Sequence, residues 1–183
     1  MDNFAEYILT EEDFDSKVEI MYRFQKKEKI FFDSSVVFKA AIVKMFVDNM
    51  NIDIDSNLVV TAMLLCACKK ADIAQTLEKL KSYAKDGAEY LKTLGFSERF
   101  CKICEEHNRY SGSSNREKES DILELVDQFC GMMMDRPERR GFPISEAIVL
   151  LEHRNLKEVS NIYMKEFKEF VDIAKEVSVE WLE

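Results

Sequence analysis

Apolar side chains recur every three or four residues along most of this chain, which is the spacing of one face of an α-helix. Residues 58–68 are apolar almost all round and follow Ser56, a candidate N-cap, so we expect them to form the central buried helix. Gly95 is the expected C-terminal cap of a long helix over 72–94, and Ser97 the start of the next one. The predicted helical segments are about 10–29, 34–47, 56–68, 72–94, 97–107, 120–134, 145–153 and 155–183.

The C-terminal segment has an amphipathic pattern of its own. Its apolar residues follow steps of three and four and form one stripe between charged faces. The stripe consists of Leu156, Val159, Tyr163, Phe167, Phe170, Ala174, Val177 and Trp181. A helix of about 27 residues would extend about 40 Å, which is longer than a domain of this size needs. Two interpretations stay open: the helix packs along the domain's own core, or part of it pairs with a partner or a second copy.

The composition favours a single all-α domain. The 183 residues are 46% hydrophobic and 33% charged, which is enough apolar material for a core. Only 5 glycines and 2 prolines leave few turn signals, which disfavours a many-stranded β fold. A net charge of −9 opposes binding to nucleic acid, and Arg136, Arg139 and Arg140 form the one candidate basic cluster. We therefore expect no nucleic-acid partner.

The cysteines predict a reducing environment. The chain has five cysteines, which are Cys66, Cys68, Cys101, Cys104 and Cys130. The number is odd, and four of them lie inside apolar helical patterns, where a thiol acts as a small core residue. The N-terminus lacks the positive start and apolar run of a signal peptide. No stretch approaches the ~18 uncharged apolar residues of a membrane span. We expect a cytoplasmic protein without membrane contact.

Six short motifs follow one another from residue 64 onward. They are Leu-Leu-Cys-Ala-Cys-Lys-Lys at 64–70, Tyr-Ala-Lys-Asp-Gly-Ala-Glu-Tyr-Leu at 83–91, Glu-His-Asn-Arg-Tyr-Ser-Gly at 106–112, Ile-Leu-Glu-Leu-Val-Asp at 122–127, Arg-Pro-Glu-Arg at 136–139 and Ile-Ser-Glu-Ala at 144–147. In this order and spacing they resemble the motifs of the HD superfamily of metal-dependent phosphohydrolases, and the HD-GYP branch in particular. The resemblance implies an HD-like helical domain at 33–153, between an N-terminal helical extension at 1–32 and a C-terminal helix at 154–183.

The resemblance also identifies the positions at which the family holds its metals, and most of those ligands are replaced in this chain. The family reads Leu-Leu-His-Asp-Ile-Gly-Lys where this chain has its first motif. The replaced positions are Cys66, Ala67, Tyr83 and Glu106, together with a missing upstream histidine near 35–37. His107 and Asp127 are retained, whereas the Gly-Tyr-Pro triplet that names the branch is absent. Two protein ligands do not hold a catalytic dinuclear centre, so we expect the activity to be lost.

Two smaller metal sites are alternatives. One is a single zinc or iron ion held by Cys66, Glu106, His107 and Asp127. The other is a structural zinc site with the ligands Cys101, Cys104, His107 and either Cys66 or Cys68. Because Cys101 and Cys104 alternate with apolar residues in a core-like pattern, packed free thiols are the favoured interpretation, and we expect neither a metal nor another cofactor.

Asp127 lies on the border between an apolar and a polar flank of its helix. If it points into the protein without a metal, it needs another cation or donors to offset the loss of water. His107, Lys69, Lys70 or Arg109 could supply them, which predicts a polar remnant of His107 and Asp127. The candidate ligand-binding residues are His107, Arg109, Asp127 and Arg136.

Two functions from different classes follow from the resemblance. The first is a catalytically inactive HD-GYP-like module of bacterial signalling that binds a protein partner or a second copy of itself, with the C-terminal helix as the candidate homodimer surface. The alternative is a metal-dependent phosphohydrolase that acts on, or binds, a cyclic dinucleotide or another nucleotide. The missing ligands favour the first.

Overall fold

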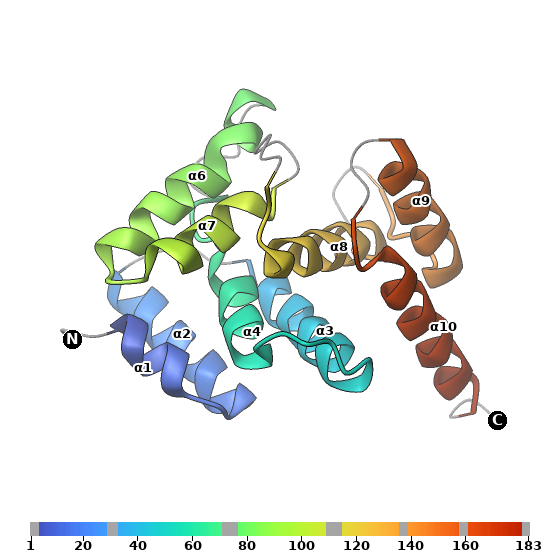
Figure 1. The fold of residues 1–183 in the computed structure, drawn as a ribbon, viewed down its shortest axis with the longest axis horizontal. Helices are drawn as coiled ribbons and strands as arrows, with labels where there is room; N and C mark the ends of the chain where they lie inside the picture. The colour runs from blue at the N-terminus through green and yellow to red at the C-terminus, as the bar shows by residue number, and fades with distance from the viewer. Residues whose placement is uncertain are drawn as a thin grey trace.

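The computed structural model describes residues 4–28, 33–70, 77–108, 115–135, 139–157 and 161–180. These residues form nine α-helices, so the prediction of an all-α fold is confirmed. The helices are α1 (Phe4–Thr10), α2 (Phe14–Glu28), α3 (Ser35–Asn49), α4 (Ser56–Leu65), α6 (Leu77–Thr93), α7 (Glu98–Glu106), α8 (Lys118–Met133), α9 (Ile144–Lys157) and α10 (Met164–Glu180). Figure 1 shows α1 and α2 at one end, α9 and α10 at the other, and α3, α4 and α8 between them. No helix in the described ranges is long and apolar enough to span a bilayer.

Helix α4 is the central element of the core, as its apolar pattern predicts. Residues 59–65 are all buried, and α4 contacts α1, α2, α3, α7 and α8. Its N-cap is Asp55 rather than Ser56, because the Asp55 side chain accepts the hydrogen bond from the Leu58 amide at 3.0 Å. The α-helix ends at Leu65, earlier than expected, and the backbone continues in tighter turns.

The turn between α6 and α7 has the predicted capping residues. Gly95 has a φ of +91°, and the Phe96 amide donates to the Leu91 carbonyl at 3.3 Å, which is the pattern of a Schellman motif. The Ser97 side chain then accepts the hydrogen bond of the Phe100 amide at 3.2 Å and begins α7. These local signals set the direction of α7 and bring its end into the core.

The prediction of one continuous helix from residue 155 to the C-terminus is wrong, because α9 and α10 are separate helices. Asn161 turns the chain between them. Its side-chain oxygen accepts from the Tyr163 amide at 3.1 Å, and its side-chain nitrogen donates to the Asp121 carbonyl of α8 at 2.8 Å. Asp121 is 40 positions away in the sequence, so local periodicity does not reveal this contact.

Helix α10 packs on the core, in line with the first of the two interpretations. Phe167 and Phe170 are buried, and their rings lie 5.1 and 5.5 Å from the ring of Phe46 in α3. Phe129 of α8 contacts the Phe167 ring from another side at 5.3 Å. The remaining stripe side chains at 156, 159, 177 and 181 lie outside what the structure describes.

The N-terminal segment is a two-helix hairpin that packs on α4. Its first helix, α1, has only 7 residues and was not predicted from the pattern. Phe4 of α1 stacks on Phe24 of α2 with ring centroids 3.9 Å apart. Lys17 of α2 is buried, and its Nζ donates to the Ile8 carbonyl at 2.8 Å and to Thr61 Oγ1 of α4 at 2.6 Å. One side chain thus links all three helices.

Candidate functional site

Five polar or sulfur-bearing side chains from five parts of the chain meet in the core. We call them the central polar site: Lys39 of α3, Cys66 after α4, Tyr83 of α6, His107 after α7 and Asp127 of α8. Four of them are buried, and the side chain of Asp127 is 22% exposed. The Asp127 carboxylate affects the pKa values of Cys66, Tyr83 and His107, so all three lie within electrostatic range of it.

Lys39 and Asp127 form an ion pair. Lys39 Nζ lies 2.7 Å from Asp127 Oδ1, and the Lys39 side chain is 6% exposed. Burial favours a lower pKa for Lys39, but the Asp127 carboxylate outweighs it and raises that pKa. Burial likewise favours a higher pKa for Asp127, but Lys70 and Lys39 outweigh it and hold that pKa well below its usual range. Both groups are therefore charged at neutral pH.

His107 is a neutral imidazole whose tautomer follows from its two hydrogen bonds. Nδ1 faces the Cys104 carbonyl, which can only accept, so Nδ1 carries the proton. Nε2 then accepts from the hydroxyl of Tyr83 at 3.1 Å. Burial lowers the pKa of His107 to about 4, although Asp127 and the bond to Cys104 oppose this. Burial also raises the pKa of Tyr83, so its hydroxyl keeps its proton and remains the donor.

Lys70 lies at the edge of the central polar site. Its Nζ is 5.3 Å from the centroid of the Tyr83 ring, and its side chain is half-buried. Its charge contributes to the low pKa of Asp127. Lys69 instead lies over the ring of Tyr90 at 4.4 Å. Of these two expected cations, Lys70 is the one that acts electrostatically on Asp127.

His107 and Asp127 lie in the same polar site and act on each other electrostatically, but no hydrogen bond joins the two among the described residues. His107 bonds to Tyr83 and Cys104, and Asp127 bonds to Lys39. Sequence reasoning missed Lys39, although the signal was present. It is a charged residue on the buried face of α3, in register with Val36, Ala40 and Val43.

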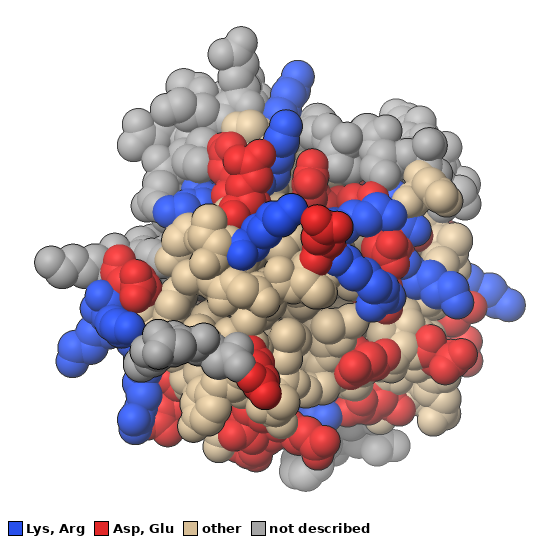
Figure 2. Space-filling model, turned by 60° about the vertical axis from the view of Figure 1, so that its left-hand side comes forward, with Lys and Arg blue, Asp and Glu red and all other residues tan. Residues whose placement is uncertain are grey.

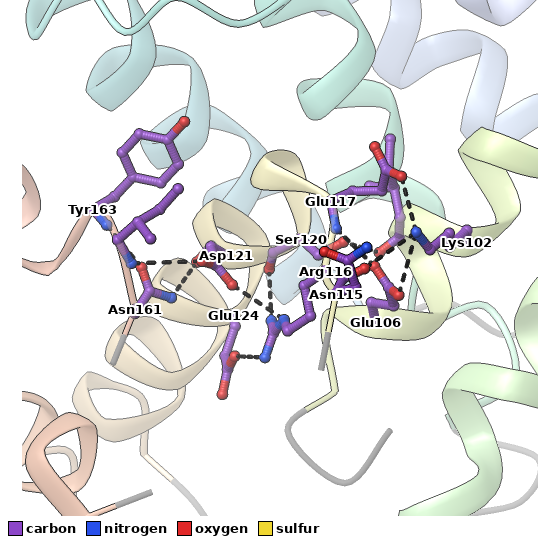
Figure 3. A network of polar contacts seen from close by, with 12 residues as sticks. Lys102, Glu106, Asn115, Arg116, Glu117, Ser120, Asp121, Glu124, Asn161 and Tyr163 are labelled. Carbon is purple, nitrogen blue, oxygen red and sulfur yellow. Dashed lines mark hydrogen bonds and ion pairs between the residues drawn. The ribbon is translucent and has the colours of Figure 1, made fainter. Parts of the chain in front are cut away.

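Glu106, another expected ligand position, belongs to a different cluster. Its Oε2 accepts from the Glu117 amide at 2.8 Å, and its Oε1 lies 3.8 Å from Lys102 Nζ. Figure 3 shows Glu106 together with Lys102 and Glu117, where the end of α7 meets the segment that leads into α8. We call the charged groups there, with Arg116 and Asp121, the α7–α8 polar network. Glu106 satisfies a backbone amide instead of completing the central polar site.

Arg116 extends the α7–α8 polar network to α10. Its guanidinium pairs with Asp121 at 3.1 Å and with Glu124 at 2.5 Å, and its side chain is 11% exposed. Asp121 in turn accepts a long hydrogen bond of 3.5 Å from the Ile162 amide, just before α10. Burial raises the pKa of Asp121, although Arg116 opposes it. The network therefore connects three helices through several shared partners (Figure 3).

The donor atoms of the central polar site do not fit the metals of the resembled family. Asp127 is already paired with an ammonium group, and the Ala67 side chain has no donor atom. Burial raises the pKa of the Cys66 thiol, and its Sγ faces the Met63 carbonyl at 3.7 Å. Among the described residues, no three His, Cys, Asp or Glu side chains are arranged to hold a metal ion.

The alternative zinc site is not assembled either, because the described His and Cys side chains are not arranged in a group that could hold a metal ion. All five cysteines are buried free thiols, as the sequence predicted. Burial raises the pKa of both Cys101 and Cys104. Cys101 Sγ faces the Phe96 carbonyl at 3.9 Å, and the Cys104 carbonyl occupies His107 Nδ1. These thiols pack in the core.

The structure accounts for some of the remaining candidates. Arg109 and Arg136 lie outside the described residues. Arg139 donates to the Met132 carbonyl at 3.0 Å and to the Gly131 carbonyl at 2.8 Å, so it caps the C-terminal end of α8. His153 is exposed on α9.

Taken together, the central polar site holds one fixed ion pair and one neutral Tyr-His pair. Such groups can stabilise the junction of several helices, and the Lys39 ammonium neutralises the carboxylate that faces it. They lack an activated nucleophile and a base that accepts a proton near neutral pH. Comparison with protein-family models, with curated proteins and with solved structures found no match.

Proposed function

We propose that this chain is a catalytically inactive HD-GYP-like module that acts in bacterial signalling by binding, either to a protein partner or to a second copy of itself. The observation that carries the proposal is the ion pair of Lys39 and Asp127, with 2.7 Å between Nζ and Oδ1. The Lys39 ammonium group occupies the position beside the Asp127 carboxylate where a bound metal ion would have to lie.

Electrostatics explain why this pair opposes metal binding. At about 4 Å and an effective dielectric constant near 20, two like unit charges repel each other by about 4 kcal/mol. The repulsion between the Lys39 ammonium and a divalent metal ion at that distance would be twice as large. A metal that displaced Lys39 would leave a buried ammonium without its carboxylate, which is also unfavourable. A protein that still bound metal here would need a neutral or anionic group at position 39.

The convergence of the central polar site supports the resemblance itself. Cys66, Tyr83, His107 and Asp127 were singled out by motif positions that lie far apart in the sequence. They come from different helical regions and lie within electrostatic range of one another. A family that collects its metal ligands from successive helices would produce such an arrangement, and replaced ligands would leave it in this form.

Binding rather than chemistry is supported by the surface. Several large apolar side chains are exposed, among them Tyr7, Val149 and Ile173. Phe167 and Phe170 of the apolar stripe on α10 are buried in the core of the domain. A homodimer through the C-terminal helix would therefore have to use the outer face of α10, where Ile173 is 49% exposed.

The metal content of the purified full chain tests the proposal. Prepared without chelator, the protein should hold well below one equivalent of manganese, iron, nickel and zinc combined, measured by mass spectrometry of the elements. It should not hydrolyse bis(p-nitrophenyl) phosphate or a cyclic dinucleotide when these metals are added. If one equivalent or more copurifies, and replacing His107 and Asp127 together by alanine removes it, the protein is a metal-binding phosphohydrolase and the proposal is wrong.

A further inference from the structure

A groove of about 610 Å³ runs between α1 and α2 on the side away from α10. One wall is formed by Phe4 and Tyr7 of α1, and the other by Ile20, Arg23 and Phe24 of α2. The lining positions of α2 extend from Ser16 to Phe24 at helical spacing, so this wall follows about two turns, or roughly 12 Å, of helix. The volume lies within the range of about 300–1,000 Å³ that is usual for protein binding sites.

The floor of the groove is rigid. The rings of Phe4 and Phe24 are stacked at 3.9 Å, and Phe96, next to the capping glycine, contacts Phe4 at 6.0 Å. The hairpin is tied to α4 by Lys17, which donates to Ile8 and Thr61. Burial lowers the pKa of Lys17 to about 8. A floor that is already formed reduces the entropy cost of binding a partner.

The groove has an exposed aromatic wall. Tyr7 is 64% exposed, the largest fraction among the exposed large apolar side chains of the described residues. A tyrosine offers apolar contact area at low entropic cost, together with a polar tip that tolerates water. Such side chains at the edge of an apolar groove are typical binding hot spots. The feature therefore favours a partner with apolar side chains.

The charge around the groove restricts what that partner can be. Residues 4–16 include five carboxylates and no lysine or arginine: the acidic residues are Glu6, Glu11, Glu12, Asp13 and Asp15. Of the charged residues that line the groove, Arg23 and Glu19 form an ion pair that offsets both charges, which leaves Glu11 as the acidic side chain of the lining. In Figure 2, acidic side chains dominate the lower half of this face, whereas Lys and Arg gather at its left edge and across its upper half.

We propose that this groove binds a basic amphipathic helix of a partner protein, an inference that rests on the binding role proposed above. Apolar residues of that helix at positions i, i+3 or i+4, and i+7 would pack between Tyr7 and Ile20, and its flanking Lys and Arg side chains would face Glu11 and the neighbouring carboxylates of residues 4–16. A second copy of this chain docked symmetrically would bring the same carboxylates together, so it is disfavoured as the occupant.

A designed peptide tests this proposal on the full chain. The probe is a fluorescein-labelled helix of about 14 residues with leucines at i, i+3, i+4 and i+7 and lysines elsewhere. Its matched control has glutamate in place of each lysine. Fluorescence anisotropy should show micromolar binding of the basic peptide, weakened by salt, and no binding of the acidic one. The variant Glu11→Gln/Glu19→Gln should weaken binding of the basic peptide several-fold.

A pair of surface variants separates docking in the groove from general charge attraction. Tyr7→Ser should weaken binding of the basic peptide at least about tenfold. Ile173→Ser, which removes an exposed apolar side chain on distant α10, should leave it unchanged. Equal binding by both variants, or binding of the acidic peptide, overturns the proposal. The proposal is also overturned if the chain associates with itself and the Tyr7→Ser substitution abolishes that association. None of these outcomes changes the metal content that tests the proposed function.

Discussion

The central polar site and the α7–α8 polar network contain the same kinds of groups but distribute their charges differently. In the central polar site, the Lys39 side chain is 6% exposed and has one carboxylate partner, Asp127. In the network, Arg116 contacts two carboxylates, and Lys102, at 45% exposure, contacts Glu117 while remaining in water. Removing either member of the buried pair leaves a buried charge without its bonded partner, whereas a network can lose a member and rearrange.

The largest expected effect is at Lys39. Lys39→Met should lower the free energy of unfolding by about 3 kcal/mol, because the Asp127 carboxylate loses the ammonium group that bonds to it at 2.7 Å and keeps only the longer-range charge of Lys70. The double variant Lys39→Met/Asp127→Leu should recover most of that loss, because it removes both charges. Urea denaturation followed by circular dichroism measures both.

Lys44 provides a matched control on the same helix, since it pairs with Asp48 at 2.6 Å in an exposed position. Lys44→Met should change the free energy of unfolding by less than about 0.5 kcal/mol. If Lys39→Met and Lys44→Met cost the same, the difference between buried and exposed pairs drawn here is wrong.

The second effect is a dependence of stability on pH at His107. Burial lowers the pKa of His107 from 6.5 to about 4, so the unfolded chain binds one more proton than the folded chain between these values. Stability therefore falls as the pH drops from 6.5 towards 4, by about 1.4 kcal/mol per pH unit from this group. Carboxylates also titrate at the acidic end and add to the slope of the free energy of unfolding against pH. The measurement is therefore the difference in that slope between the wild type and His107→Gln.

The same measurement on the other histidine is the control. His153 is exposed on α9 and lies outside the central polar site, so His153→Gln should retain the wild-type slope. A wild-type slope in His107→Gln would show that His107 is not the titrating group.

The smallest effects belong to the α7–α8 polar network. Arg116→Met should lower the free energy of unfolding by about 1–3 kcal/mol, because Asp121 and Glu124 are partly buried but keep other partners or water. Lys102→Met should lower it by less than about 1 kcal/mol, because Lys102 is 45% exposed and its buried neighbour Glu106 still accepts from the Glu117 amide. A loss at Lys102 as large as that at Arg116 would mean that exposure does not decide the strength of these pairs.

Local signals in the sequence were sufficient for much of the fold. Gly95 and Ser97 predict the turn between α6 and α7 because a left-handed residue and an N-cap act on neighbouring backbone atoms. The apolar run at 59–65 predicts the central helix for the same reason. The break between α9 and α10 was missed because Asn161 bonds to Asp121 across 40 positions. Periodicity records the faces of a helix but not the contacts made from one helix to another.

The candidate site shows the same division. The motif comparison singled out Cys66, Tyr83 and His107, and the structure brings these into one region. It did not identify Lys39, which pairs with Asp127 across 88 positions. It assigned Glu106 to the same site, although that side chain satisfies the Glu117 amide. A motif predicts where along a helix a residue lies. The direction in which its side chain points depends on which nearby group can form a hydrogen bond with it.

The ion pair of Lys39 and Asp127 also has a consequence for the history of the protein. Any route from this site to one that binds a metal must exchange the ammonium for a ligand. A chain in which only Lys39 has changed leaves the carboxylate without its bonded cation, and a chain in which only Asp127 has changed leaves the ammonium without its bonded carboxylate. Each single step passes through a less stable protein, so selection for folding alone would preserve the present pair. The loss of metal binding proposed here would be hard to reverse by one substitution at a time.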